Sequence, residues 1–391
     1  MALEFKIARG APGDDFWEQF SALWQNSADR SPFKAPHLLR YFVSRTKGKT
    51  TAFKCLKENR LVGTILLKEN AGVYTFLSDM KTDVNFIVLD RHLSQDEQKQ
   101  FFEGLLQTIK QEKWMLILNN QPSWAGYMPI FEEVGKSSGL FWLNFSYSVC
   151  PYVQAENPQI LFEQVNGSRE LRYRMNKLKK QEAAEFEALT DGFELDLWVK
   201  EFCTAHVLRW ADTPTPSAYR DPARQQFLLE CLKAWNEDGL LVRFAVKVRQ
   251  RRVGFVVGLL EANSLIHHST TFHPDYWKFS PGKALILFMT QWMKDHGLRM
   301  LDFGDGNEPY KYDVADQEHV LNRIFISSKI NISFIMKASM IKFVRNHPKV
   351  YHLYQNRLKP WAARTAAALN NPGVLSFSLF RFTMFACLAG I

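Results

Sequence analysis

The same order of secondary structure is predicted twice along the chain, and this repetition restricts the fold more than any other feature. In each half, short apolar strands alternate with polar turns and are followed by a helix and one further strand. The elements of the first half are a hairpin, a third strand, a helix and a closing strand, at residues 51–57, 61–68, 73–77, 96–112 and 114–119. Those of the second half follow in the same order at residues 241–248, 253–261, 265–272, 281–296 and 299–303. Two such units predict an α/β protein with a duplicated fold, in which each lobe has a mixed β-sheet and flanking helices.

Segments outside the two units complete the predicted organisation. Residues 141–153 are rich in β-forming side chains and are expected to join the two sheets. Helices are expected at residues 169–189, 193–210 and 224–238. The chain then divides into a first lobe at 1–150, a second lobe at 151–328, and a helical region at 329–391.

A loop in the second half has the properties of a phosphate site. Residues 280–283, Ser-Pro-Gly-Lys, directly precede an apolar helix. The first N–H groups of a helix have no intrahelical acceptor, and together with the helix dipole they attract phosphate. The equivalent segment of the first half, residues 78–93, has no such loop. Only the second half is therefore predicted to hold a phosphate-rich cofactor, although Ser-Pro-Gly also starts helices that bind no ligand.

The second half resembles the FemAB-like and CelD-like branch of the GNAT acyltransferases. The resemblance is carried by His206-x-x-Arg209-Trp210, the hairpin around Gly254, Phe279-Ser280-Pro281-Gly282, Gly297-Leu298-Arg299, and Leu301-Asp302-Phe303-Gly304-Asp305-Gly306-Asn307-Glu308-x-Tyr310-Lys311. Phe76-Leu77-Ser78 and Asp83-x-Asn85-Phe86 extend a weaker likeness to the first lobe, so that it covers roughly residues 15–328. The resemblance implies a duplicated GNAT-like fold and transfer of an acyl group from a thioester to an amine, commonly in building cell-envelope polysaccharide or lipid. Ordinary GNAT phosphate loops are richer in glycine; here only Gly282 is present.

The resemblance also implies acyl-CoA as the acyl donor. Its pyrophosphate is expected at the helix start, and the predicted donor-binding residues are Phe272, Ser280, Pro281, Gly282, Lys283 and Ala284. The predicted substrate-binding residues are Arg209, Trp210, Glu308 and Lys311. For Glu308 and Lys311, and for Tyr310 between them, a satisfied turn network is an equally good interpretation, and the tryptophan could belong to the core.

Three residues are predicted to take part in catalysis. An attacking amine must lose a proton, and the thioester carbonyl needs hydrogen-bond donors. His206 is a candidate base, and Asp302 could orient it, hold the acceptor ammonium or act as base itself. Tyr310 could protonate the leaving thiolate. Direct attack is expected because no cysteine falls in the motif, and no HExxH or Cys/His cluster indicates a metal.

The excess positive charge of the chain lies at its C-terminus. Residues 329–391 contain nine basic side chains and no acidic ones, leaving 40 of the 49 basic residues against 40 acidic ones elsewhere. Basic residues interleaved with aromatic and aliphatic ones suit a helix on an anionic membrane surface, but a helix packed on the core with solvated lysines fits as well. No base-reading motif accompanies the charge, so DNA is not expected as a partner and tRNA is disfavoured.

The predicted protein is a cytoplasmic N-acyltransferase, peripheral on the inner face of the cytoplasmic membrane. Scattered cysteines, no secretory h-region and no apolar run of about 18 residues support this location. The expected acceptor is a lipid amine, such as a sphingoid base that would become a ceramide-type amide, or an amino sugar. Two alternatives remain: a FemAB-type transferase that uses aminoacyl-tRNA, and a catalytically inert GNAT-like binding scaffold.

Overall fold

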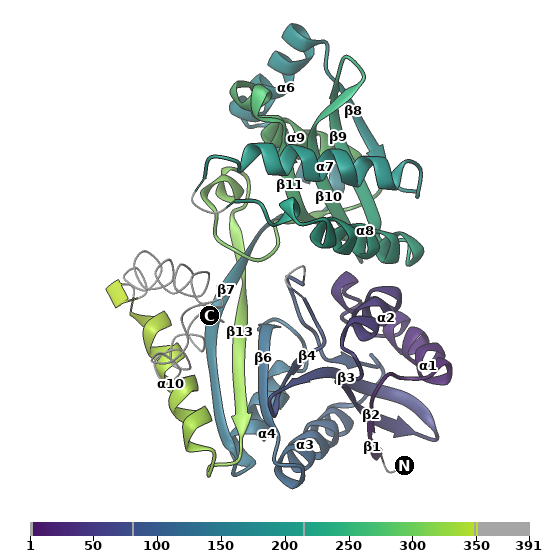
Figure 1. Ribbon diagram of the computed structural model, residues 1–391, viewed down its shortest axis with the longest axis vertical. Coiled ribbons are helices and arrows are strands. Elements are labelled where there is room, and N and C mark those ends of the chain that lie inside the picture. Colours follow the sequence, from purple (N-terminus) through teal and green to yellow (C-terminus); the bar gives the residue numbers. More distant parts are fainter. Residues whose placement is uncertain (1–2, 80–81, 214–215, 348, 351–391) are drawn as a thin grey trace, which may run out of the picture.

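One continuous β-sheet runs through both halves of the protein (Figure 1). The computed structural model describes residues 3–79, 82–213, 216–347 and 349–350. Within these residues the strand order is β1-β2-β3-β4-β6-β13-β7-β12-β11-β10-β9-β8, and β5 pairs with β3 beside this path. The predicted mixed α/β, two-lobed fold is confirmed, but the two expected sheets are joined edge to edge.

The first lobe packs an aromatic-rich core between its part of the sheet and its helices. Its strands are β1 (Glu4–Arg9), β2 (Thr50–Lys57), β3 (Arg60–Asn70), β4 (Val73–Phe76), β5 (Val88–Leu89) and β6 (Met115–Pro122). Its helices are α1 (Asp14–Gln25), α2 (Pro36–Arg45), α3 (Gln95–Gln111) and α4 (Met128–Ser137), with a 3-10 turn η1 (Pro32–Lys34). A capping box of Ser94 and Glu97 begins α3, where sequence reasoning places a helix start to within one residue.

The second lobe repeats this plan. Its elements are α5 (Pro158–Asn166), α6 (Arg169–Glu182), β8 (Glu185–Leu189), α7 (Leu195–Arg209), η2 (Ala218–Arg220), α8 (Pro222–Glu237), β9 (Leu241–Val248), β10 (Arg251–Glu261), β11 (Ser264–Phe272), η3 (Pro274–Phe279), α9 (Pro281–Asp295), β12 (Met300–Asp302) and η4 (Pro309–Asp313). In each lobe two antiparallel hairpin strands lead to one parallel pair, β4 with β6 and β11 with β12. The duplication expected from the order of elements is therefore present in the strand pairing.

Two long strands join the lobes. β7 (Phe141–Gln154) pairs with β12 at one end and with β13 (Gln317–Ser327) along most of its length. β13 in turn pairs with β6, so a strand that follows the second unit completes the sheet of the first lobe. Figure 1 shows β7 and β13 side by side through the centre of the molecule. The prediction that residues 141–153 join the two sheets is confirmed, whereas sequence reasoning did not find β13.

The predicted basic helix at 169–189 is too long. It ends at Glu182, because Ala183 adopts a left-handed conformation with φ of 49°, and residues 185–189 form the edge strand β8 against β9. The helical interpretation missed the alternation of Phe186 and Ala188, which pack on the core of the second lobe, with glutamates. Residues 185–189 thus form a strand because they pair at the edge of the sheet, although the charge pattern of the preceding helix predicted a longer helix.

The first helix of the C-terminal region packs on the sheet. α10 (Ile332–Asn346) buries Phe334, Ala338 and Ile341 against β7 and β13, which is the core-packing alternative for this stretch. The same helix exposes Ile332, Met336 and Phe343. None of the helices in the described part of the chain combines the length and apolar character that crossing a bilayer requires. Residues 351–391, which belong to the same predicted region, lie outside the described residues.

Candidate functional site

The parallel strands of the second lobe separate where the candidate site begins. β11 and β12 are paired only from Ser264 and Met300 to Ile266 and Asp302. β12 ends there, while β11 continues to Phe272. β11 also contains a bulge, because Val257 of β10 lies opposite Ser269 and Gly258 lies opposite His267, which leaves the intervening residue without a partner. Bulges redirect side chains and leave backbone groups unpaired, and they are common beside active sites.

The start of α9 lies beside this separation. Ser280 precedes the helix with φ of 53° and ψ of 61°, a left-handed conformation that serine adopts only when its surroundings impose it. The N–H groups of Lys283 and Ala284 both donate to the Ser280 carbonyl, at 3.0 and 3.3 Å. Within the described residues the Gly282 N–H has no such acceptor. The helix start therefore offers a backbone donor with the positive end of the helix dipole behind it.

A glycine in the hairpin positions this helix. A Cβ atom on Gly254 of β10 would lie 2.7 Å from Cβ of Pro281, the first residue of α9. Only glycine permits the helix to approach the strand so closely. The resemblance to the GNAT branch included Gly254 without a physical reason, and the structure supplies it.

A cavity of about 200 Å³ lies at the junction of these elements. Six predicted site residues line it: Arg209, Phe272, Ser280, Gly282, Lys283 and Tyr310. Sequence reasoning missed the other three lining residues, His267, Thr270 and Ile286. Regular alternation would place residues 268, 270 and 272 on one face, but the bulge brings residue 267 to that face instead. The pairing of β10 and β11 is the only signal that reveals His267.

Lys283 is held by two carboxylates. Its Nζ lies 2.9 Å from Glu170 Oε1 and 2.9 Å from Asp313 Oδ2. Burial favours the neutral amine, but the hydrogen bonds with these carboxylates outweigh it and raise the pKa of Lys283 above its usual value. The lysine is therefore charged and largely neutralised. Phosphate attraction at this helix start depends more on backbone donors than on Lys283.

Further cations surround Phe279, directly before the helix start. Lys177 and Lys278 lie 5.3 and 5.0 Å from the centre of its ring, and Arg174 donates to the Lys278 carbonyl at 3.2 Å. Two of these residues come from α6, the basic helix predicted from the sequence. These cations lie beside the helix start without lining the cavity, and Arg174 also pairs with Glu170 at 3.4 Å.

Three titratable side chains line the inner part of the cavity. Burial raises the pKa of Tyr310 to about 12, with a smaller contribution from Glu308, so its hydroxyl keeps its proton. Burial lowers the pKa of His267 to about 4, so this imidazole is neutral at physiological pH. Burial also lowers the pKa of Arg209, and its guanidinium lies 4.2 Å from the ring centre of Phe272. A phenol that stays protonated can donate a proton to a departing anion.

His206 and Asp302 have separate surroundings. His206 Nδ1 lies 2.8 Å from Ser217 Oγ, and its ring packs edge-on against Tyr219 and near Trp210. It does not line the cavity, although Arg209 lies one helical turn further along α7. Trp210 likewise is not among the lining residues. The expectation that Asp302 orients His206 finds no support in these contacts.

Asp302, Glu308 and Lys311 belong to a turn network. Asp302 accepts a hydrogen bond from the Gly304 N–H at 2.7 Å. The Lys311 ammonium is 3% exposed, donates to the carbonyls of residues 304–306 at 2.9–3.2 Å, and pairs with Glu308 at 2.9 Å. These contacts match the turn-network alternative for Glu308 and Lys311. Their predicted contact with substrate stays a prediction.

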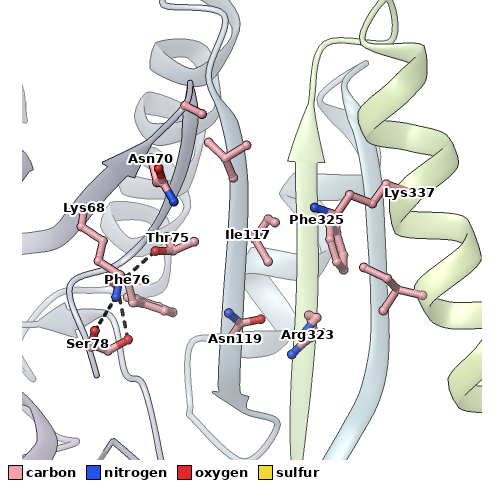
Figure 2. A pocket seen from close by; sticks show the side chains of 13 residues that line it. Lys68, Asn70, Thr75, Phe76, Ser78, Ile117, Asn119, Arg323, Phe325 and Lys337 are labelled. Atoms are coloured by element: carbon pink, nitrogen blue, oxygen red, sulfur yellow. Dashed lines mark hydrogen bonds between the residues drawn. The ribbon is translucent and has the colours of Figure 1, made fainter. Parts of the chain in front are cut away.

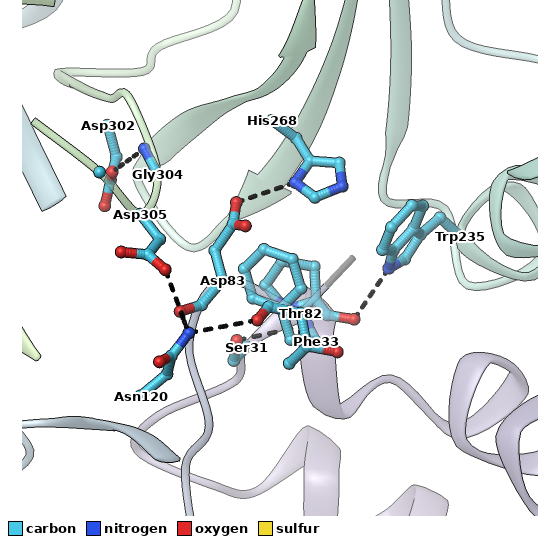
Figure 3. A network of polar contacts seen from close by, with 12 residues as sticks. Ser31, Phe33, Thr82, Asp83, Asn120, Trp235, His268, Asp302, Gly304 and Asp305 are labelled. Atoms are coloured by element: carbon cyan, nitrogen blue, oxygen red, sulfur yellow. Dashed lines mark hydrogen bonds and ion pairs between the residues drawn. The ribbon is translucent and has the colours of Figure 1, made fainter. Parts of the chain in front are cut away.

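A polar network connects this turn to the first lobe (Figure 3). Asp83 Oδ2 lies 2.9 Å from His268 Nδ1 across the lobe interface. Asn120 donates to the Asp83 carbonyl at 2.9 Å and to Asp305 Oδ2 at 3.3 Å, and Ser148 donates to the other Asp305 oxygen. The Asp83–His268 pair was not expected from the sequence. Asp83, a residue of the GNAT-like motif in the first lobe, thus contacts the second lobe.

Replacing Asp302 with asparagine should change the pH dependence of stability. Burial is the main cause that raises the pKa of Asp302 to about 6, from a usual value of 3.8. As the pH rises from 4 to 6, the unfolded state ionises first, so Asp302 progressively lowers the free energy of unfolding. Asn keeps an acceptor for the Gly304 N–H and cannot ionise. We expect the free energy of unfolding of Asp302→Asn, measured by urea unfolding, to rise by about 2–3 kcal/mol relative to that of wild type between pH 4 and pH 7. A difference that does not vary with pH would contradict this.

Comparison with known proteins identifies the class. Residues 166–312 match the family model described as acetyltransferase (GNAT) domain. The second lobe thus matches a GNAT acetyltransferase domain, and the resemblance to GNAT acyltransferases is confirmed for these residues. This domain contains α7, α9, β11 and η4, which together form the cavity.

Solved structures with the same fold cover both lobes. L-PGS from Bacillus licheniformis has a TM-score of 0.56 at 11% identity and covers 85% of this chain and 98% of its own. FemX has a TM-score of 0.57 at 9% identity, covering 82% and 98%. The C-terminal domain of a putative lysylphosphatidylglycerol synthetase from Agrobacterium fabrum has a TM-score of 0.54 at 9% identity, covering 84% and 96%. At such identities the likeness shows the fold alone. No curated protein sequence matches the chain.

Proposed function

We propose that the protein is an acyl-CoA-dependent N-acyltransferase. One observation carries this proposal: within the part of the chain that matches a GNAT domain, a cavity along the unpaired end of β11 is bounded by the start of α9, Arg209 and Tyr310. A helix start with an unpaired N–H suits a pyrophosphate, and the cations around Phe279 suit the remaining phosphate of CoA. The protonated Tyr310 suits a departing thiolate.

In the proposed reaction the acceptor amine attacks the thioester carbonyl. The N–C bond forms, the C–S bond breaks, the amine loses one proton and the thiolate of CoA gains one. Unpaired backbone at the β11 bulge can donate to the carbonyl oxygen as negative charge develops on it. Tyr310 is our candidate for the general acid. His206 and Asp302 stay our candidates for the base, and pH–rate profiles of His206→Gln and Asp302→Asn would distinguish them.

Tyr310→Phe should lower turnover without weakening donor binding. The change removes only the hydroxyl that would protonate the thiolate, and general acid catalysis contributes about 100-fold or more. We expect kcat to fall by about 100-fold, while the Kd for CoA changes less than threefold. Stopped-flow thiol detection and calorimetry would measure the two quantities. An unchanged kcat would remove Tyr310 from the mechanism, and a loss of CoA binding would assign it a binding role.

For the acceptor we propose an amine of a cell-envelope lipid, such as a sphingoid base, at the cytoplasmic face of the membrane. The exposed Ile332, Met336 and Phe343 on α10, together with basic residues on the same helix, support contact with an anionic membrane. Flotation with anionic vesicles tests this contact. Substitution of these three residues by aspartate should abolish flotation of the full chain. An amino sugar is the rival acceptor, and mass spectrometry of lipids and polysaccharides from a deletion strain would distinguish the two.

The aminoacyl-tRNA alternative is supported by fold alone, through FemX and the putative lysylphosphatidylglycerol synthetase. Thermal-shift titration with CoA and with tRNA separates the two donors. Stabilisation by CoA that Gly282→Asp abolishes would support the proposal. Stabilisation by tRNA and none by CoA would overturn it in favour of the alternative. If neither ligand binds, an inert scaffold becomes the better interpretation.

A further inference from the structure

A second and larger cavity lies in the first lobe, away from the donor site. Its volume is about 510 Å³, and it lies between β4, β6 and β13 with α10 on one side (Figure 2). Cavities of roughly 300–1,000 Å³ accommodate small organic molecules. None of its lining residues belongs to the donor site. Binding of a ligand in this cavity is therefore independent of the function proposed above.

The charged side chains that line the cavity are all positive. Lys68, Arg323 and Lys337 line it, and its described lining contains no aspartate or glutamate. The Lys68 ammonium is partly satisfied by the Ser78 carbonyl at 2.7 Å. Figure 2 shows Arg323 beside Asn119, on the neighbouring strands β13 and β6, and Lys337 reaching across from α10. The cavity therefore attracts anions from two of its walls.

Arg323 is a buried cation without an acidic partner. The residue is 6% exposed, and within the described residues its Nε has no hydrogen-bond acceptor and its guanidinium has no ion pair. Its guanidinium carbon lies 3.7 Å from the ring centre of Tyr147, whose side chain also hydrogen-bonds the guanidinium, so Nε is the group that lacks an acceptor. Burial accordingly lowers the pKa of Arg323. A buried charge without a counterion is costly, and proteins retain such groups mainly where a ligand completes them.

The position of Arg323 results from an irregularity in the sheet. The pairing of β13 with β6 shifts between Asn322 and Ile324, so Arg323 lies opposite a bulge formed by Asn119 and Asn120 of β6. The side-chain oxygen of Asn119 is also buried, with no donor in the part of the chain that the structure describes. Two unpartnered polar groups thus meet at one end of the cavity. A protonated phosphate or a hydroxylated head group has both the acceptor and the donor that they lack.

The rest of the cavity is apolar. Val73, Ile117, Phe325 and Ile341 contribute to its lining, and the phenylalanine and the last isoleucine belong to the core that seats α10. Such a surface binds an aliphatic chain through burial and offers nothing to a fully polar anion. We propose that the first-lobe cavity binds an anionic amphiphile, with a phosphate or carboxylate on Arg323 and an aliphatic chain along the apolar wall.

Calorimetry with the full-length protein and dodecyl phosphate, below its critical micelle concentration, tests the proposal. We expect saturable binding, at least about tenfold weaker binding of inorganic phosphate, and no competition by dodecyltrimethylammonium. Gly282→Asp should bind dodecyl phosphate normally, which separates this cavity from the donor site. Equal affinity for inorganic phosphate would overturn the amphiphile, and loss of binding in Gly282→Asp would assign the ligand to the donor site instead.

Substitutions at Arg323 and Lys337 test whether these residues bind the ligand. Arg323→Met should weaken binding by about tenfold or more, since hydrogen bonds to a charged group are lost. Its stability should equal or exceed that of wild type, because an unpaired buried charge is replaced by a side chain of similar shape. Lys337→Glu should weaken binding several-fold, whereas Lys342→Glu, the same change on the same helix outside the cavity lining, should not. Unchanged affinity in both Arg323→Met and Lys337→Glu would overturn the proposal. Should Arg323→Met fail to fold, the two lysine variants still decide.

Discussion

Gly282→Asp is expected to lose CoA binding while keeping full stability. A Cβ atom at this position would lie 3.8 Å from Thr270 Oγ1, an ordinary contact, so the backbone accepts a side chain without strain. The new carboxylate would stand at the N-terminus of α9, where interaction with the helix dipole adds about 0.3–1 kcal/mol of stability. The same carboxylate would repel the donor's pyrophosphate. At 4 Å and an effective dielectric of about 20 this repulsion is about 4 kcal/mol, so affinity should fall by at least 100-fold.

Gly282→Ala is the matched control. It adds the same Cβ atom without charge, and its affinity for CoA should stay within a few-fold of wild type. Calorimetry with CoA and thermal unfolding of the three proteins measure both effects. Gly282→Asp should lower the affinity for CoA and leave stability unchanged or higher, and this combination distinguishes a ligand site from a structural helix start. Normal CoA binding by Gly282→Asp would mean that the phosphates lie elsewhere.

Arg252→Met should cause the largest loss of stability among the substitutions considered. The Arg252 side chain is 6% exposed and is surrounded by three glutamates, Glu187 of β8, Glu194 before α7 and Glu201 within α7. The hydrogen bonds to these carboxylates outweigh burial and raise the pKa of Arg252 further above its usual value. Methionine would leave three carboxylates close together, with Lys247 beside Glu187 as the remaining counterion among the described residues. Removing one partner of a buried ion pair costs about 3–5 kcal/mol.

Loss of the Arg252 side chain should also weaken binding at the proposed donor site. Arg252 holds α7 against the sheet, and the last residue of α7 is Arg209, which lines the donor cavity. We therefore expect weaker CoA binding in Arg252→Met together with lower stability. Arg251→Met is the control, since its side chain is exposed and neighbouring in sequence, and its effect should stay within about 0.5 kcal/mol. Equal destabilisation by the two variants, in urea unfolding at neutral pH, would disprove the role of the glutamate cluster.

Most of the proposed donor site could be predicted from the sequence because it is local. Ser280, Gly282 and Lys283 follow one another at a helix start, and Tyr310 follows the strand after that helix. Short-range order of strand, loop and helix was sufficient to bring these residues together. His267 could not be predicted, because its orientation depends on a bulge that only the pairing of β10 with β11 creates.

Other contacts of the predicted site residues depend on the tertiary structure. His206 contacts Ser217 and Asp302 contacts the Gly304 turn, so the suggestion that Asp302 orients His206 stays a prediction. At Lys283, α6 and η4 bring in Glu170 and Asp313. Neither carboxylate is near Lys283 in the sequence, and no local pattern announces them.

By itself the sequence determined the duplicated order of elements, the helix start that suits phosphate and the GNAT character of the second half. These features depend on hydrophobic periodicity, on capping and on residues adjacent along the chain. Only the tertiary structure decided that β13 crosses back to complete the first lobe, that Arg323 is buried with no counterion among the described residues, and that Asp83 meets His268 between the lobes. Each of these results from pairing between distant strands, whose register is determined by the burial of whole faces and not by neighbours in sequence.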